Sequence, residues 1–272
     1  MAESFSVSMC VYGKDNPEWF QIAVESILQQ SVKPSEVVLV VDGPIPEELG
    51  RIISTYEKRD IFKVIRLEKN MGHGVARRTG LENCSHELVA LMDADDISVP
   101  QRFEKQLAEF ARKPDVSVIG GIISEFIDEE TASVGCRVVP ENHEDICTYL
   151  KVRCPMNQVT VMFRKSDVLK AGGYLDWYCN EDYYLWLRMY LEGMRFSNIP
   201  EVLVNVRVDE EMYQRRGGWK YFSSEAKLQN YMLTKRVIDP ATYLMNIMKR
   251  LLVQVVLPNR MRGWVFRNFA RK

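Results

Sequence analysis

The chain has 272 residues, of which 46% are hydrophobic and 27% are charged, with a formal net charge of −1. This length suits one large α/β domain, or one domain with a small appendage, and no stretch reaches the roughly 20 apolar residues of a membrane-spanning helix. The six cysteines show no CxxC spacing, which disfavours zinc and disulfide frameworks and favours reduced thiols.

The first third of the chain alternates strand-like and helix-like segments. Short apolar runs predict strands at 5–12, 36–41, 62–67 and 88–92, and helical periodicity predicts helices at 17–30, 47–58 and 75–83. This order is typical of an α/β fold with a doubly wound, mostly parallel sheet flanked by helices.

The remaining segments continue the mixed pattern without an internal repeat or a low-complexity linker. We expect helices at 102–112, 144–151, 165–171, 181–192, 220–234 and 240–257, and strands at 117–127, 158–164 and 202–208. Residues 128–158 are otherwise expected to be rich in loops.

Three carboxylates, Asp93, Asp95 and Asp96, follow the apolar strand at 88–92. Burying three like charges without a partner is costly, and open α/β sheets bind ligands at the carboxyl ends of their strands. Because Asp93 and Asp95 are two residues apart, they share one face of an extended segment. The cluster therefore predicts a site for a divalent cation and a phosphorylated substrate. The alternative is a helix cap by Asp96 or Ser98, although a cap needs only one such residue.

Other polar groups stand at neighbouring strand ends. A ring at Tyr12 and a carboxylate at Asp42 together suit a uracil base, although a turn explains Asp42 equally well. The glycine-containing loop 70–74 opens a helix, and its N–H groups with Arg77 suit a diphosphate. The alternative there is a structural turn with surface arginines.

These segments resemble family 2 glycosyltransferases of the GT-A fold, from Phe5 to Arg188. The matching pieces are SVSMCVYG, the Gln29-Gln30-Ser31 helix end, VVLVVDG, NMGHGVARRTG, LVALMDADD, the AGGY turn and NEDYYLWLRM. Further pieces, MFRKSDVL and RRGGWKY, resemble bacterial enzymes that build O-antigen, capsule or exopolysaccharide repeat units.

The resemblance implies a role for single residues on the donor side. Asp95 is the implied main ligand of Mn²⁺ or Mg²⁺, with Asp93 on the metal or the ribose. Tyr12 and Asp42 are implied to hold the base, and Arg77 to lie near the diphosphate.

On the acceptor side, the resemblance implies that Asp182 is the general base. One base with in-line displacement inverts the anomeric centre. Glu181 and Asp182 also suit a second interpretation, in which they are acidic residues in the first turn of a helix. The implied acceptor side further contains Gly172, Gly173, Glu181 and Trp186.

The implied reaction transfers a hexose, glucose or galactose, from a UDP-sugar to a saccharide carried on undecaprenyl diphosphate, in β linkage to N-acetylglucosamine. The implied place is the bacterial cytoplasm, peripheral on the inner face of the membrane, and the N-terminal sequence lacks a secretory signal pattern. A nucleotidyltransferase is an alternative, but it normally has an early phosphate loop, and residues 8–20 contain one Gly and one Lys.

The charge is divided unevenly along the chain. Residues 212–272 hold 13 Lys/Arg and 2 Asp/Glu, or +11, and residues 1–211 therefore hold −12. A basic, aromatic and apolar helical segment suits an anionic membrane surface. Nucleic acid is disfavoured by the acidic body, and a third interpretation is a helical cap that packs on the sheet. A non-enzymatic protein recruited by this tail is the remaining alternative to an enzyme.

We therefore predict a GT-A domain at 1–211 and a basic helical extension at 212–272 that docks on a membrane without spanning it. A helix lying flat buries one apolar side in the bilayer. The side expected to do so consists of Leu244, Ile247, Met248, Leu251 and Leu252.

Overall fold

The computed structural model describes residues 3–128, 130–208 and 217–257. Its first half alternates strands and helices as predicted, with shifts of a few residues at the ends of elements. These elements are β1 (Phe5–Tyr12), α1 (Pro17–Leu28), β2 (Glu36–Asp42), α2 (Glu47–Tyr56), β3 (Phe62–Arg66), α3 (His73–Asn83) and β4 (Leu88–Met92).

The second half is less regular. Its elements are β5 (Ile97–Ser98), α4 (Arg102–Arg112), β6 (Val116–Phe126), β7 (Ser133–Arg137), α5 (His143–Leu150), η1 (Gln158–Thr160), β8 (Met162–Arg164), α6 (Lys165–Lys170), α7 (Glu181–Leu191), β9 (Arg195–Arg207), α9 (Gly218–Thr234), α10 (Pro240–Leu251) and η2 (Leu252–Val256).

Two predictions on strands were wrong in part. The segment 158–164 begins as a 3₁₀ turn and only its end is a strand, and β9 begins at Arg195, well before residue 202. Pro200 interrupts the apolar pattern of β9 and cannot donate to a ladder. The register between β6 and β9 shifts at this point, between Gly121 and Ile122. The short strands β5 and β7 were not predicted.

The described strands form one sheet in the order β3-β2-β1-β4-β8-β6-β9-β5, with β7 paired to β6. The ladders from β3 to β4 are parallel, as is the ladder between β6 and β9. Strand β8 runs antiparallel between β4 and β6, so these two central strands point the same way. The predicted doubly wound, mostly parallel sheet is therefore confirmed.

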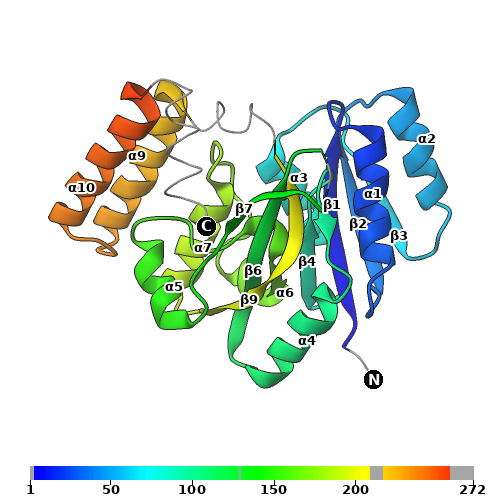
Figure 1. Cartoon of the computed structure of the whole chain (residues 1–272), viewed down its shortest axis with the longest axis horizontal. Helices are drawn as coiled ribbons and strands as arrows, with labels where there is room; N and C mark the ends of the chain where they lie inside the picture. The colour runs from blue at the N-terminus through cyan, green and yellow to red at the C-terminus, as the bar shows by residue number, and fades with distance from the viewer. Residues whose placement is uncertain (1–2, 129, 209–216, 258–272) are drawn as a thin grey trace.

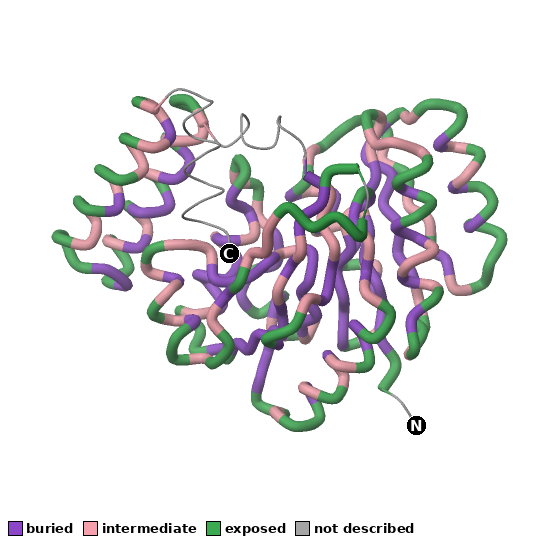
Figure 2. The backbone as a smooth tube through the Cα atoms, viewed as in Figure 1, coloured by how far each residue is buried: buried purple, intermediate pink, exposed green. Residues whose placement is uncertain are grey.

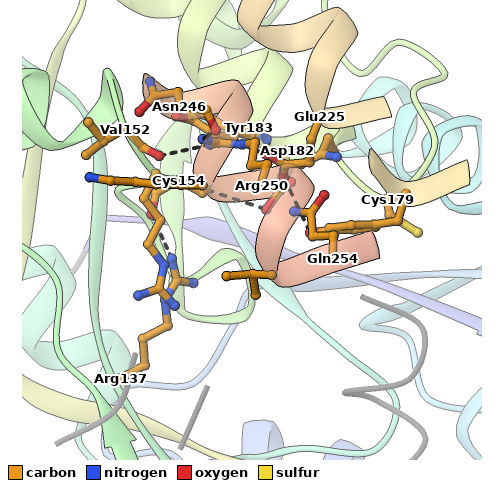
Figure 3. Close-up of a pocket in the computed structure, with 15 residues that line it drawn as sticks. Arg137, Val152, Cys154, Cys179, Asp182, Tyr183, Glu225, Asn246, Arg250 and Gln254 are labelled. Atoms are coloured by element: carbon orange, nitrogen blue, oxygen red, sulfur yellow. Dashed lines mark hydrogen bonds and ion pairs between the residues drawn. The ribbon is translucent and has the colours of Figure 1, made fainter. Parts of the chain in front are cut away.

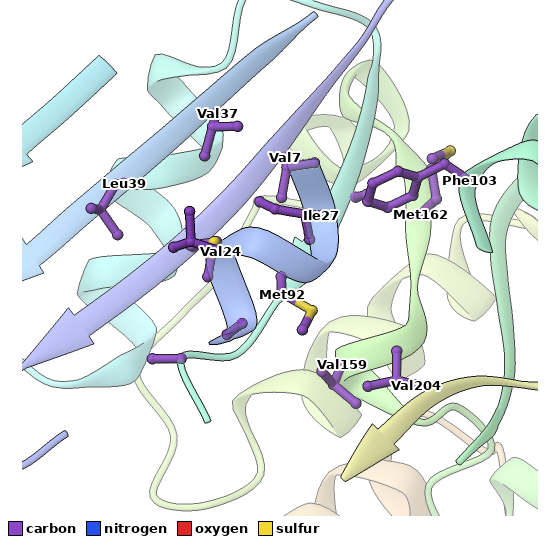
Figure 4. Packing of buried hydrophobic residues seen from close by; sticks show 14 of the residues in the cluster. Val7, Val24, Ile27, Val37, Leu39, Met92, Phe103, Val159, Met162 and Val204 are labelled. Carbon is purple, nitrogen blue, oxygen red and sulfur yellow. The ribbon is translucent and has the colours of Figure 1, made fainter. Parts of the chain in front are cut away.

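Two hydrophobic clusters cover the two faces of the sheet. Leu88, Ala90 and Met92 of β4 belong to the cluster under α1, α2 and α4, whereas Val89 and Leu91 belong to the one under α3, α5 and α7. Figure 4 shows part of the first cluster, where α1 side chains meet β1 and β4. Such alternation is expected of a strand that is buried on both faces. The buried strands form the centre of the molecule in Figure 2.

The helices α9 and α10 lie at the end of the molecule opposite α2 (Figure 1). Leu228 and Met232 of α9 belong to the second cluster, and the ring of Tyr231 meets Tyr184 of α7 edge-on at 5.2 Å. Asn246 of α10 donates to the carbonyl of Lys151 at 2.9 Å. The inner side of this helix pair is therefore packed against the rest of the fold.

The predicted boundary between residues 211 and 212 falls in 209–216, outside the described residues, as do the basic residues of 258–272. Within 3–128, 130–208 and 217–257, no helix combines the length and hydropathy needed to span a bilayer.

Candidate active site

A pocket opens where β1, β2 and β4 end and α3 begins, the edge at which open α/β sheets bind ligands. All five residues predicted for the donor side line it, and they come from four separate segments. The complete lining is Cys10, Val11, Tyr12, Asp15, Asp42, His73, Ala76, Arg77, Asp93, Ala94 and Asp95. We call this the donor pocket.

The carboxylates after β4 do not lie in an extended strand as expected, because the strand ends at Met92 and a turn follows. Asp93 and Asp95 still line one pocket. Asp96 turns away: it is 3% exposed, and it accepts from the backbone N–H of Arg207 at 2.9 Å. Neither Asp96 nor Ser98 caps α4, because the residue before that helix is Gln101. Of the three carboxylates, Asp93 and Asp95 therefore belong to the pocket, and Asp96 has a structural role.

The donor pocket concentrates negative charge. Asp15 accepts from the backbone N–H of Tyr12 at 2.9 Å, and burial together with neighbouring Asp95 and Asp93 raises its pKa to about 7. Carboxylate oxygens are the ligands that Mg²⁺ prefers, and it is usually held by one or two of them plus substrate phosphates. The residues therefore fit such a cation, although the described residues contain no cluster of three or more potential metal-ligating side chains.

Asp42 orders the loop that precedes α3. Its two carboxylate oxygens accept from the backbone N–H groups of Met71 at 2.6 Å and Gly72 at 3.0 Å. Gly72 precedes α3, adopts φ 86° and provides no side-chain cap. The first turn of α3 begins at His73, which lines the donor pocket. A helix N-terminus of this kind attracts anions through its N–H groups and its dipole.

Arg77 joins the donor pocket to the start of α7. This arginine is only 9% exposed, and its guanidinium donates to Asp93 at 3.1 Å and to Glu181 at 2.9 Å. The alternative of a surface arginine at this position is therefore wrong. The two ion pairs fix the distance between the turn after β4 and the first residue of α7.

A second pocket lies at the start of α7, where Asp182 follows Glu181, and Figure 3 shows the residues around it. Asp182 lines this pocket beside Arg250 of α10 and Arg137 of β7. The complete lining is Arg137, Val152, Arg153, Cys154, Cys179, Asn180, Asp182, Tyr183, Tyr221, Glu225, Asn246, Lys249, Arg250, Val253 and Gln254. We call this the basic pocket.

The environment of Asp182 suits a proton acceptor. Burial and the neighbouring Glu181 raise its pKa to about 6, while Arg77 and the N–H of Tyr183 act in the opposite direction. A carboxyl group with a pKa close to the working pH is an efficient general base. Its neighbour Glu181 instead faces Arg77, so the two acidic residues at the start of α7 have different surroundings.

Four residues predicted for the acceptor side, Gly172, Gly173, Glu181 and Trp186, line neither pocket. Trp186 is 0% exposed and belongs to the second hydrophobic cluster, so it packs in the core and has no surface open to a ligand. Gly172 and Gly173 adopt φ 88° and 63° at the end of α6, where glycine is the favoured residue. Arg188 of α7 donates to the carbonyls of Ala171 and Gly173, which ties this turn to α7.

Sequence reasoning missed several pocket residues. Asp15 and His73 were not predicted to belong to the site, although each stands two residues before a predicted helix. Arg137 and Arg250 come from separate elements of the second half and belong to no motif, so no local signal points to them.

Two family models match this chain. Glycosyl transferase family 2 matches residues 6–167, and Glycosyl transferase family group 2 matches residues 88–266. The chain belongs to glycosyltransferase family 2. It is therefore a glycosyltransferase, and the resemblance seen in its motifs is confirmed.

Two curated bacterial relatives match this glycosyltransferase over most of its length. UDP-Gal:alpha-D-GlcNAc-diphosphoundecaprenol beta-1,3-galactosyltransferase of Escherichia coli is 36% identical over 268 residues, covering 98% of this chain and 97% of the relative. Amylovoran biosynthesis glycosyltransferase AmsE of Erwinia amylovora is 38% identical over 229 residues, covering 84% and 85%.

Solved structures share the fold at low identity. S. aureus TarS 1-349 in complex with UDP-GlcNAc has a TM-score of 0.66 at 17% identity, covering 97% of this chain and 79% of that one. Mannosyltransferase PcManGT from Pyrobaculum calidifontis, in complex with GDP-Man and Mn2+, has a TM-score of 0.63 at 15% identity, covering 96% and 72%. The predicted GT-A fold is thereby confirmed.

Proposed function

We propose that this glycosyltransferase moves a hexose, galactose or glucose, from a UDP-sugar to a saccharide carried on a polyprenyl diphosphate, with inversion at the anomeric carbon. One observation carries the proposal. Arg77 holds Asp93 of the donor pocket and Glu181 of α7 on one guanidinium, and Asp182 is the next residue of α7. A donor site and a proton acceptor at one junction are the two parts that glycosyl transfer to a hydroxyl requires.

On the donor side, Tyr12 and Asp42 lie at the ends of adjacent parallel strands, and a base is proposed to stack on the ring and to donate its imide N–H to the carboxylate, whose oxygens also hold the loop before α3. The N-terminus of α3 then lies next to the diphosphate. The Escherichia coli relative has UDP-Gal in its name, which supports a uridine nucleotide and favours galactose.

A divalent cation, Mn²⁺ or Mg²⁺, is proposed to be held by Asp95 with Asp93. When bound, it neutralises the charge that develops on the leaving nucleoside diphosphate. Asp95 is exposed at the pocket rim, and the side chain of Asp93 remains 39% exposed although one of its oxygens pairs with Arg77. Both residues therefore have oxygen atoms that are accessible to a ligand.

On the acceptor side, Asp182 is proposed to take the proton of the attacking hydroxyl. The new bond forms between that oxygen and the anomeric carbon while the bond from this carbon to the diphosphate oxygen breaks on the opposite side. One displacement of this kind inverts the configuration. Glu181 is proposed to position Arg77, because its carboxylate already accepts from that guanidinium.

The outer side of α10 and η2 is proposed to dock on an anionic membrane. Leu244, Met248, Leu252 and Val256 follow one another at every fourth position and are 61%, 58%, 54% and 63% exposed. Ile247 and Leu251 were also expected on the lipid side, but they are half-buried and therefore less exposed than this row. Such an apolar row in a region of +11 charge suits the surface of a bilayer with anionic lipids. Docking on the cytoplasmic face is proposed to bring the enzyme to its lipid-linked acceptor.

The test is a panel of UDP-sugars offered with a synthetic N-acetylglucosamine diphosphate lipid, with the product identified by mass and by the anomeric coupling in its NMR spectrum. The expected product is one hexose heavier and inverted in configuration. Release of inorganic pyrophosphate from a nucleoside triphosphate would favour the nucleotidyltransferase alternative. No hexose transfer and no hydrolysis of any UDP-sugar, with Mn²⁺ present, would favour a non-enzymatic role.

A further inference from the structure

We infer that the basic pocket, on the side of Asp182 away from the donor pocket, binds the diphosphate group of the lipid-linked acceptor. This inference rests on the proposed function, because it takes the acceptor to be a diphosphate. It assigns a binding role to residues of β7, the 152–154 loop and α10 that the reaction itself does not use.

The charge of the pocket favours an anion. Four cationic side chains line it, and two carboxylates, Asp182 and Glu225, accompany them. A diphosphate joined to a sugar at one end and a lipid at the other carries one ionised oxygen on each phosphorus, which matches this surplus of two positive charges. The four cations are Arg137, Arg153, Lys249 and Arg250.

Three of these cations differ in their hydrogen-bond partners and in their exposure. Nε of Arg250 lies 2.5 Å from a carboxylate oxygen of Glu225, so this pair is a neutral part of the wall. Arg137 donates to the backbone carbonyls of Cys154 at 2.7 Å and Met156 at 3.4 Å, which carry no formal charge. Lys249 is exposed at the rim. Charge-assisted hydrogen bonds to phosphate oxygens are stronger than bonds to neutral carbonyls.

The position of the pocket relative to the base fits one acceptor sugar. Arg137 is close enough to Asp182 to lower the pKa of that carboxyl, against the larger effects of burial and Glu181. A sugar whose hydroxyl meets Asp182 would have its anomeric diphosphate across the ring, toward the cations on α10. The carboxylate and the cations in one pocket therefore suit the two ends of a single sugar phosphate.

The helix α10 with η2 also connects this pocket to the proposed membrane surface. Asn246, Lys249, Arg250, Val253 and Gln254 line the pocket at helical spacing. Leu244, Met248, Leu252 and Val256 form the exposed row between them. One helix thus has a polar side that faces the pocket, seen in Figure 3, and an apolar side that suits lipid. A lipid diphosphate likewise has a charged group next to an apolar chain, with the charged group at the surface of the bilayer.

The inference is tested by titrating the full-length protein with decyl diphosphate and with decyl monophosphate, by calorimetry, with chelator present and below the micelle concentration of either lipid. The variant Arg153→Gln/Lys249→Gln removes two cations from the pocket. The matched control Arg51→Gln/Lys58→Gln removes two cations from another basic hollow, on α2. Lys249→Gln alone is the reserve variant, since Lys249 is exposed and its loss leaves packing unchanged.

Wild type and control are expected to bind the diphosphate about tenfold more tightly than the monophosphate. The pocket variant is expected to lose about tenfold or more for the diphosphate and little for the monophosphate, the size of effect of losing charge-assisted hydrogen bonds. In transfer assays, the acceptor KM should rise in the pocket variant while the KM for the UDP-sugar stays unchanged. Equal binding of the two lipids by wild type, or unchanged diphosphate binding by a folded pocket variant, would overturn the inference.

The two proposals fail in distinguishable ways. If wild type transfers no hexose to any diphosphate acceptor, the proposed function is wrong, but the titration with decyl diphosphate still decides whether the pocket binds a diphosphate. If transfer occurs and the pocket variant has an unchanged acceptor KM, the proposed function stands and the pocket assignment is wrong.

Discussion

The guanidinium of Arg77 donates to the carboxylate of Glu181 at 2.9 Å, although 104 residues separate the two in the chain. The same guanidinium donates to Asp93 at 3.1 Å. One side chain therefore connects the loop that ends β4 to the helix that presents Asp182. This arginine therefore helps to set the position of α7 relative to the donor pocket.

Replacement of Arg77 should destabilise the fold. Arg77→Gln leaves the carboxylates of Asp93 and Glu181 close together without a cation, and removal of one partner from a buried ion pair typically costs about 3–5 kcal/mol. Because the side chain of Asp93 is 39% exposed, we expect the lower end of this range. Urea denaturation measures the free energy of unfolding. The exposed Arg51→Gln serves as the control, and an equally small loss in both variants would contradict the prediction.

Asp182→Asn should abolish proton removal while it preserves the fold. Loss of a general base typically lowers kcat by about 10²–10⁴-fold. Binding of UDP should be unchanged, because Asp182 lines the basic pocket and not the donor pocket. Steady-state kinetics and a UDP titration provide the two readouts, and Asp176→Asn, at an exposed position in the loop before α7, is the matched control. Turnover within a few-fold of wild type would transfer the role to another residue, Glu181 first.

The acceptor kcat/KM, measured at saturating UDP-sugar, should depend on pH through Asp182. Only the deprotonated carboxylate accepts a proton, and its pKa is about 6, so the rate should be constant well above this value and fall as the pH drops below it. In Glu181→Gln a negative neighbour is lost and Arg77 keeps its charge, so the fall should move to lower pH. A shift toward higher pH in this variant would contradict the assigned cause.

Asp95 and Asp96 should behave differently despite being adjacent. Asp95→Asn is expected to remove Mn²⁺-dependent UDP binding, measured by titration with and without chelator, and to leave the melting temperature unchanged. Asp96→Ala leaves the buried N–H of Arg207 without its acceptor, which typically costs about 1–3 kcal/mol of stability. If Asp95→Asn retained cation-dependent binding, Asp93 or Asp15 would be the principal ligand.

The exposed row on α10 and η2 should carry membrane binding. The variant Leu244→Ser/Met248→Ser/Leu252→Ser is expected to weaken co-sedimentation with anionic vesicles by about tenfold or more, because each buried apolar side chain contributes about 1 kcal/mol or more. Binding by wild type should also fade with ionic strength. Serine at Ile22, Val134 and Leu169, which are 44%, 52% and 44% exposed elsewhere, provides the matched control.

If wild type fails to bind anionic vesicles at low salt, the membrane assignment is wrong. The helices α9 and α10 would then serve only as packing elements and as a wall of the basic pocket.

Elements with local signals could be predicted from the sequence. The alternation from β1 to β4 follows from apolar runs and helical periodicity. The acidic run after β4 is recognisable because three carboxylates follow an apolar strand, but the turn that it forms was not predicted. Residues at the ends of parallel strands, such as Tyr12 and Asp42, were placed in one pocket because the topology of such a sheet brings these ends together.

The tertiary structure alone decided which of the singled-out residues share a pocket and which are structural. Asp96 accepts from Arg207 and Glu181 accepts from Arg77, whereas their neighbours Asp95 and Asp182 line pockets. Neighbours in sequence point to different sides of a turn or helix, and packing across the sheet determines which side meets solvent. Residues of β7, α7, α9 and α10 line the basic pocket. Its cationic side chains come from segments that are far apart in the sequence, so no short-range pattern relates them.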